Sequence, residues 1–132
     1  MYRNIIMSER KIPKQYLPKS LTPADRKKQK ESIVKKKARP KVDSFKSQRS
    51  SYVIKFEKKY GTKITNDDFI NKNIITRTGI KKILDKGMAA YYNTGSRPNQ
   101  TAQSWSRARL ASVIVGGPAR RVDKDIWEQY KR

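Results

Sequence analysis

Three arginines, Arg97, Arg107 and Arg109, have the clearest chemical use of any side chains in this sequence. They lie in the stretch 87–115, which holds tyrosines and a tryptophan but no lysine, although lysines are spread through the rest of the chain. This composition indicates fixed guanidinium contacts, because the planar fork binds phosphate or carboxylate through two parallel hydrogen bonds. The alternative is internal pairing, in which Arg97 ties the turn to carbonyls of its own domain or to Asp85, and Arg107 and Arg109 form surface or interdomain pairs.

Short basic runs elsewhere are further candidates for binding an anionic partner: Lys27, Lys28, Lys35, Lys36, Lys37, Arg120 and Arg121. The chain has 33 Lys+Arg against 11 Asp+Glu, a formal net charge of +22. Such runs are commonly no more than solvated faces. Here the excess predicts contact with a polyanion, which is nucleic acid, an acidic protein surface or an anionic membrane. Contacts with nucleic acid of this kind are salt-sensitive and indifferent to base sequence.

The sequence contains few side chains suited to acid–base catalysis or metal binding. Cysteine and histidine are both absent, which removes thiolate ligands, thiol nucleophiles and the commonest general base. The carboxylate pairs Asp67–Asp68 and Asp123, Asp125 fall at expected helix starts, where capping explains them. We therefore expect no catalytic residue, metal site, cofactor or small-molecule substrate. No run approaches the ~18 apolar residues of a membrane span, so we expect a soluble or peripheral protein.

Helices are expected to position the stretch 87–115. A helix beginning at Thr78 places apolar residues on one face at helical spacing, and a second runs from Thr101 to about Val115. The residues expected to shape the packing of these helices and the turn between them are Gly87, Tyr91, Gly95, Pro98 and Trp105. Gly87 should permit close approach of another helix. The aromatic residues, including Tyr92, are expected in the core, with stacking on nucleic-acid bases as the alternative.

Residues 1–50 are predicted to form a basic extended arm with one helix at about 22–38. Thr22 suits the N-cap of this helix and Pro23 its first position, while Pro40 requires it to end before that residue. The helix is so rich in lysine that it should be marginal alone and form fully only against a partner.

Residues 51–132 are predicted to form a compact helical domain. Ser50 or Ser51 caps a helix that ends at Gly61, although 52–56 has strand propensity as an alternative. Thr65 is expected to cap a brief helix over 67–70, and Asp123 a final one. The predicted fold class is thus mainly α: a small helical domain with an extended basic N-terminal arm.

Several short motifs together resemble a known family: Gly87-Met88-Ala89-Ala90-Tyr91, Gly95-Ser96-Arg97-Pro98, Gln103-Ser104-Trp105, Ala108-Arg109 and Asp123-Lys124-Asp125. With similar segments upstream, the likeness covers about Tyr16 to Trp127. It is to a domain of unknown function found in large double-stranded DNA viruses of algae and protists and in some tailed marine phages. The resemblance implies viral origin, and it carries no established activity that could be assigned to particular residues.

From this resemblance and the charge we expect a non-enzymatic virion structural protein, made in the host cytoplasm or nucleus. As a minor capsid or capsid-associated protein, it would dock on capsid proteins of a large assembly through its helical domain. The basic arm would run across adjacent subunits or toward viral DNA or an anionic membrane surface. The alternative is a sequence-independent DNA-binding or packaging protein of the virion. A third is an accessory domain of a DNA-processing enzyme, with Arg97 and Arg109 on the DNA backbone.

Overall fold

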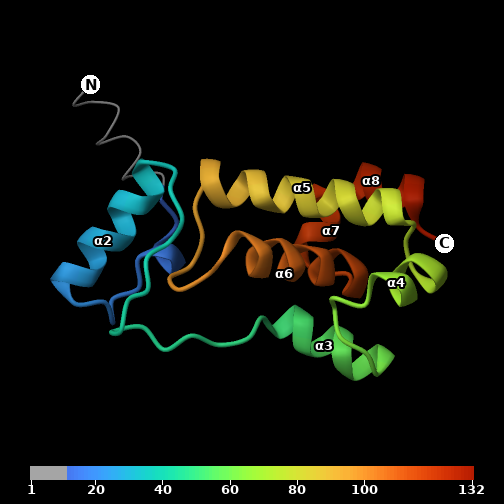
Figure 1. Cartoon of the computed structure of the whole chain (residues 1–132), viewed down its shortest axis with the longest axis horizontal. Helices are drawn as coiled ribbons and strands as arrows, with labels where there is room; N and C mark the ends of the chain where they lie inside the picture. The colour runs from blue at the N-terminus through green and yellow to red at the C-terminus, as the bar shows by residue number, and fades with distance from the viewer. Residues whose placement is uncertain (1–11) are drawn as a thin grey trace. The chain divides into compact units, whose positions relative to one another are not determined.

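The computed structural model describes residues 12–132 and is mainly helical (Figure 1). Within these residues there are seven α-helices, one 3-10 turn and an isolated bridge between Ile75 and Lys131. The predicted mainly α class is confirmed, while the extended character predicted for the first eleven residues lies outside the described part. Two compact units divide the chain: unit 1 comprises Met1–Gln48 with Ala89–Ala102, and unit 2 comprises Arg49–Met88 with Gln103–Arg132.

Unit 1 is built around the helix α2 (Pro23–Val34), which follows the 3-10 turn η1 (Lys14–Tyr16). The Thr22 hydroxyl accepts the backbone N–H of Asp25 at 3.2 Å, and Pro23 occupies the first helical position. These are the local signals that start a helix, because they satisfy or remove backbone donors that the first turn leaves unpaired.

The end of α2 comes earlier than the predicted end near residue 38. Lys36 takes a left-handed backbone conformation, with φ 56. The N–H groups of Lys36 and Lys37 donate to the carbonyls of Ile33 and Ser32 at 3.1 and 2.8 Å. This is a Schellman motif, which ends helices and is usually built on glycine. The sequence has no glycine at this point, so the motif could not be predicted from residue type.

The interior of unit 1 is small and partly polar. Gln29 on α2 is fully buried, and its Nε2 donates to the carbonyls of Tyr16 and Ser96, each at 3.0 Å. The segment 89–102 of the chain itself therefore provides part of the packing around α2. The predicted division at residue 50 differs from the observed units in this segment, because the buried polar groups of 12–48 find their acceptors there.

Unit 2 contains α3 (Ser51–Tyr60), α4 (Asp67–Asn73), α7 (Pro118–Val122) and α8 (Lys124–Tyr130). It also holds the first part of α5 (Arg77–Asn93) and nearly all of α6 (Ala102–Val115). Its core is aliphatic apart from one phenylalanine, and comprises Val53, Phe56, Ile64, Ile70, Ile74, Ile75, Ile80, Ile83, Leu110, Ala111, Val113 and Ile114. Segment 52–56 is helical rather than a strand. Its helix, α3, is capped by Ser50 at the N-terminus and ends at Gly61, which has φ 65.

The two long helices α5 and α6 approach closely within unit 2. A Cβ atom at Gly87 would lie 2.8 Å from Cα of Ser106, which is closer than real Cβ contacts. Any larger residue at position 87 would therefore force α5 and α6 apart at this contact. Figure 1 shows α5 and α6 running alongside each other.

Two local predictions in unit 2 are wrong, and one helix was not predicted. The side chain of Asn66, not Thr65, caps α4 by accepting the N–H of Phe69 at 3.2 Å. Asp123 precedes α8 but makes no side-chain cap, because its carboxylate is buried and bound to Arg109. The short helix α7 was not predicted, since the Gly-Gly-Pro that ends α6 also begins it.

Candidate functional site

Arg107 and Arg109 are both paired inside unit 2. Arg107 donates to both carboxylate oxygens of Asp67, at 2.6 and 3.2 Å, and to the carbonyl of Ile64 at 3.3 Å. Arg109 binds Asp123 through Nε–Oδ2 at 2.7 Å and Nη2–Oδ1 at 2.8 Å. Both arginines are therefore paired internally, but within unit 2 and partly buried rather than in surface or interdomain pairs. These two-bond contacts leave little of either guanidinium for an external anion.

Arg120 has an equally complete internal role. Its Nε and Nη2 donate to the carbonyls of Val113 and Ile114, both at 2.8 Å, and its guanidinium lies 4.3 Å from the ring centroid of Trp127. The last carbonyls of a helix lack intrahelical partners, so Arg120 satisfies two such groups at the end of α6.

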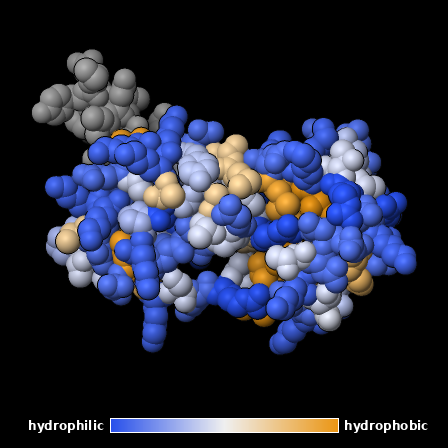
Figure 2. Space-filling view, in the orientation of Figure 1, coloured by the Kyte–Doolittle hydropathy of each residue, from blue (hydrophilic) through white to orange (hydrophobic). Residues whose placement is uncertain are grey.

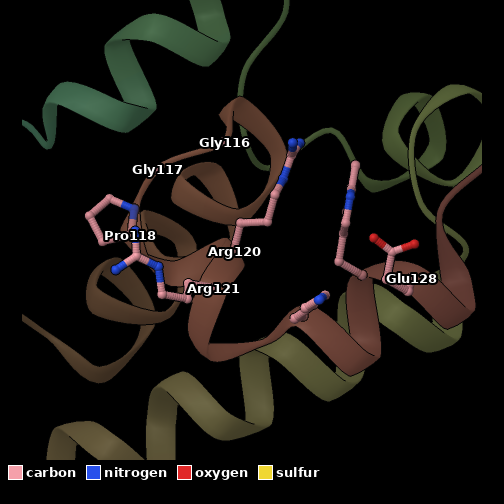
Figure 3. Close-up of a pocket in the computed structure, with 8 residues that line it drawn as sticks. Gly116, Gly117, Pro118, Arg120, Arg121 and Glu128 are labelled. Carbon is pink, nitrogen blue, oxygen red and sulfur yellow. The ribbon is translucent and has the colours of Figure 1, made fainter.

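A shallow surface pocket of ≈ 570 Å³ lies beside Arg120, between the Gly116-Gly117-Pro118 turn and α8 (Figure 3). Figure 3 shows Arg120 and Arg121 leaving the same short helix in different directions. Since Arg120 is committed to main-chain carbonyls, the exposed cations left in this pocket are Arg121 and Lys124. They do not converge with a buried polar group, so the pocket is explained as a gap beside a helix end.

Arg39 is a structural residue that sequence reasoning missed. It is 7% exposed, and no described carboxylate pairs with it. Its guanidinium donates to the carbonyls of Ser32, Lys37 and Tyr91 and lies 4.7 Å from the Tyr91 ring centroid. Burial lowers the pKa of this guanidinium, and nearby tyrosines oppose that shift. Two of the carbonyls that it binds are local, but Tyr91, which supplies the third carbonyl and the ring, is 52 residues away, and the local sequence does not indicate that contact.

The arginines thus serve mainly to hold the protein together. Those that donate a side-chain hydrogen bond to a described protein acceptor are Arg26, Arg39, Arg49, Arg77, Arg107, Arg109, Arg120 and Arg132. Among residues 12–132, the arginines with no such bond are Arg97 and Arg121.

The lysines of unit 1 behave differently. Five of them form what we call the lysine surface: Lys27, Lys28, Lys35, Lys36 and Lys37, all exposed. At about 100° per residue, Lys27 falls on the side of α2 opposite its buried residues Gln29, Ser32 and Ile33, while Lys28 and Lys35 flank the buried face on the Ser32 side. None of the five forms an ion pair with a described carboxylate.

The two units differ in how their charge is compensated. Six carboxylates of unit 2 each form an ion pair with a basic side chain: Glu57, Asp67, Asp68, Asp85, Asp123 and Glu128. Unit 1 has three carboxylates in its described part, and Asp25 among them accepts Ser44 rather than a cation. Among residues 12–132, the positive charge of unit 1 is therefore the less neutralised of the two.

A shallow hollow of ≈ 590 Å³ follows the exposed side of α2. Its lining is mostly basic and includes Lys27, Lys30 and Lys35, with Glu31 as its carboxylate. Figure 2 shows the surface over α2 as predominantly hydrophilic, with only small apolar spots. Such a row of cations can hold a chain of phosphates by charge, and it contains no group suited to acid–base or nucleophilic chemistry.

The three aromatic candidates, Tyr91, Tyr92 and Trp105, differ in how far they are buried. Tyr91 is 1% exposed, and its hydroxyl accepts the N–H of Arg39 at 2.6 Å, so it cannot stack on a base. Tyr92 is 40% exposed and lies edge-on to Tyr91, with ring centroids 4.9 Å apart. Trp105 is half-buried on α6. Of the predicted packing residues, Pro98 is also buried.

Neither metal nor membrane chemistry is indicated in the part of the chain that the structure describes. Between residues 12 and 132, no cluster of three carboxylates could hold a metal ion. In the same region, no helix combines the length and the apolar character needed to cross a membrane.

The fold and the distribution of charge define a small, mainly helical basic protein that uses arginine for structure and exposes lysine. Residues 13–129 match the family described as Family of unknown function (DUF5824), and the chain belongs to that family. No curated protein and no solved structure matches it.

Proposed function

We propose that this protein is a non-enzymatic structural protein of a large double-stranded DNA virus particle. It binds the phosphate backbone of the genome through the lysine surface and does not read base sequence. The viral setting rests on the resemblance carried by the motifs between residues 87 and 127. The observation that carries the DNA contact is the exposure of five lysines with no described carboxylate paired to them, in the less neutralised unit.

Helix electrostatics account for only part of the lysine surface. A helix dipole favours cations at the C-terminal end, which explains Lys35, Lys36 and Lys37. It gives no benefit to Lys27 and Lys28, which lie beyond the reach of that end. The like charges of an exposed row of lysines also repel one another. A polyanion that lies along the row would reduce this electrostatic repulsion.

A phosphate backbone suits this surface better than a capsid protein does. Protein interfaces are usually organised around apolar and aromatic side chains. The exposed large apolar residues of the described chain are Ile54, Tyr92 and Val122, and of these only Tyr92 belongs to unit 1. Lysine ammonium groups on flexible stems act as point charges, which fits contacts that depend on charge alone.

The test is to follow the protein when particles are opened. Nuclease treatment at high salt should release it together with the genome, and the purified chain should bind unrelated duplexes with equal affinity. Retention in emptied, salt-washed shells would contradict the DNA contact and support docking on acidic capsid proteins instead.

A further inference from the structure

The loop between α5 and α6 is fixed on the N-terminal side of Arg97. Gly95 has φ +116, and a Cβ there would lie 3.0 Å from Cγ2 of Ile33. Ser96 is fully buried, and its carbonyl accepts Nε2 of Gln29 at 3.0 Å. Both residues are therefore held against α2 within unit 1.

The loop is fixed equally well on the C-terminal side. Pro98 is fully buried. Asn99 has φ 63, and its side chain accepts the N–H of Val42 at 2.7 Å. The same side chain donates to the carbonyls of Val42 and Phe45 at 3.1 and 3.2 Å. The backbone on both sides of Arg97 thus has little freedom.

The Arg97 side chain is not part of this framework of hydrogen bonds. It is exposed, and within residues 12–132 it forms no hydrogen bond or ion pair through its guanidinium. Its predicted internal partner is occupied elsewhere, since Asp85 pairs with Lys81 at 2.8 Å. The loop is braced at Gly95, Ser96, Pro98 and Asn99, and the Arg97 carbonyl accepts the Ser96 hydroxyl at 3.0 Å, but the Arg97 guanidinium takes no part in the bracing among the described residues.

The surroundings of Arg97 are positive. Burial raises the pKa of the Tyr16 hydroxyl, while the charges of Arg97 and Arg39 both act to lower it. Tyr16 therefore lies within electrostatic range of both guanidinium groups. Arg39 is buried without a described carboxylate, and its Nε has no hydrogen-bond partner in the structure. Among residues 12–132, no carboxylate forms an ion pair with Arg39 or Arg97.

We propose that Arg97 is a pre-positioned recognition residue that binds one phosphate of a nucleic-acid backbone through both arms of its guanidinium. This inference rests on the proposed function and adds to it a single oriented contact beside the diffuse charge of the lysine surface. A braced backbone reduces the entropy lost on binding, and the planar guanidinium fork loses less entropy per hydrogen bond than a lysine ammonium does.

The substitution Arg97→Lys separates geometry from charge. It keeps one positive charge, so the slope of log affinity against log salt should not change. It loses the planar fork, so affinity for duplex DNA should fall about tenfold at every salt concentration. Arg121→Lys is the matched control, because Arg121 is also exposed and without a described partner but lies outside unit 1. Equal affinities for the two variants would overturn the inference.

A second measurement separates failure of the inference from failure of the proposed function, because it tests phosphate recognition by Arg97 directly, whether or not the chain binds DNA. In the free protein, the Nε–Hε NMR signal of Arg97 should shift and saturate with inorganic phosphate at constant ionic strength. The signal of Arg121 should shift far less. Equal shifts, or a larger response of Arg97 to acetate than to phosphate, would overturn phosphate recognition; the latter would assign Arg97 to a carboxylate of a partner protein.

Discussion

The guanidinium of Arg109 binds the buried carboxylate of Asp123 through two hydrogen bonds, of 2.7 and 2.8 Å. The Asp123 side chain is 0% exposed and that of Arg109 19%. Removal of one member of such a pair leaves the other charge uncompensated in a poorly hydrated place. The pair therefore has a structural role, and it illustrates how this protein uses most of its arginines.

Asp123→Asn should lower the free energy of unfolding by about 3 kcal/mol, because it leaves Arg109 without a counter-charge. Urea unfolding followed by tryptophan fluorescence measures this change. Asp68→Asn is the control, since the Arg77–Asp68 pair is 59% and 93% exposed and should contribute little. Equal effects of the two substitutions would show that the buried pair does not hold unit 2 together.

Asp25 should make unit 1 sensitive to acid. The Ser44 hydroxyl donates to its carboxylate at 2.5 Å and the Ser44 N–H at 3.0 Å, and these hydrogen bonds lower the pKa of Asp25. A lowered folded-state pKa stabilises the fold above the ordinary aspartate value of about 3.9. That stability is lost as pH falls through the lower, folded-state value.

Urea midpoints measured from pH 5 downward test this prediction. The midpoint of the unsubstituted chain should fall below about pH 4, and Asp25→Asn should flatten that fall. Asp43→Asn is the matched control, because Asp43 is exposed and accepts no described hydrogen bond. A control that flattened the curve as much would remove Asp25 as the cause.

Lys36→Gly should stabilise the protein while weakening DNA binding. Lys36 has φ 56, a conformation that glycine adopts without the steric cost that lysine pays. We expect a gain of about 0.5–1 kcal/mol in unfolding free energy. The same substitution removes one cation of the lysine surface, so affinity for duplex DNA should decrease. Thermal unfolding and DNA titration measure the two effects separately.

Asn99→Gly provides the contrast, since Asn99 also has positive φ, at 63. Its side-chain hydrogen bonds to residues 42 and 45 would be lost, so stability should fall rather than rise. If Lys36→Gly stabilised the chain but left its DNA affinity unchanged, Lys36 would not contact phosphate.

Local chemistry in the sequence predicted the helices well. Thr22 with Pro23, Ser50 and Gly61 mark helix ends through their own backbone or side-chain properties, so neighbouring residues suffice to identify them. The end of α2 was missed because its left-handed residue is Lys36, a residue type that gives no warning of that conformation.

Contacts between distant residues could not be predicted in the same way. The hydrogen bonds from residue 29 to 96, 39 to 91 and 42 to 99 bring 12–48 together with 89–102, and periodicity contains no information on such pairs. Arg107 likewise pairs with Asp67, which is 40 residues away in the chain. Excess charge was visible in the sequence, but which cations remained unpaired depended on these distant contacts.

The salt dependence of duplex DNA binding tests the central proposal most directly. One variant replaces four residues of the lysine surface with glutamine: Lys27, Lys28, Lys35 and Lys37. Its control replaces four exposed lysines of unit 2 with glutamine: Lys58, Lys63, Lys72 and Lys124. Both variants lose the same net charge. The first should reduce the slope of log affinity against log salt by about one for each lysine that contacts phosphate, and the control should reduce it far less. Equal slopes for the two variants would contradict a DNA contact through the lysine surface.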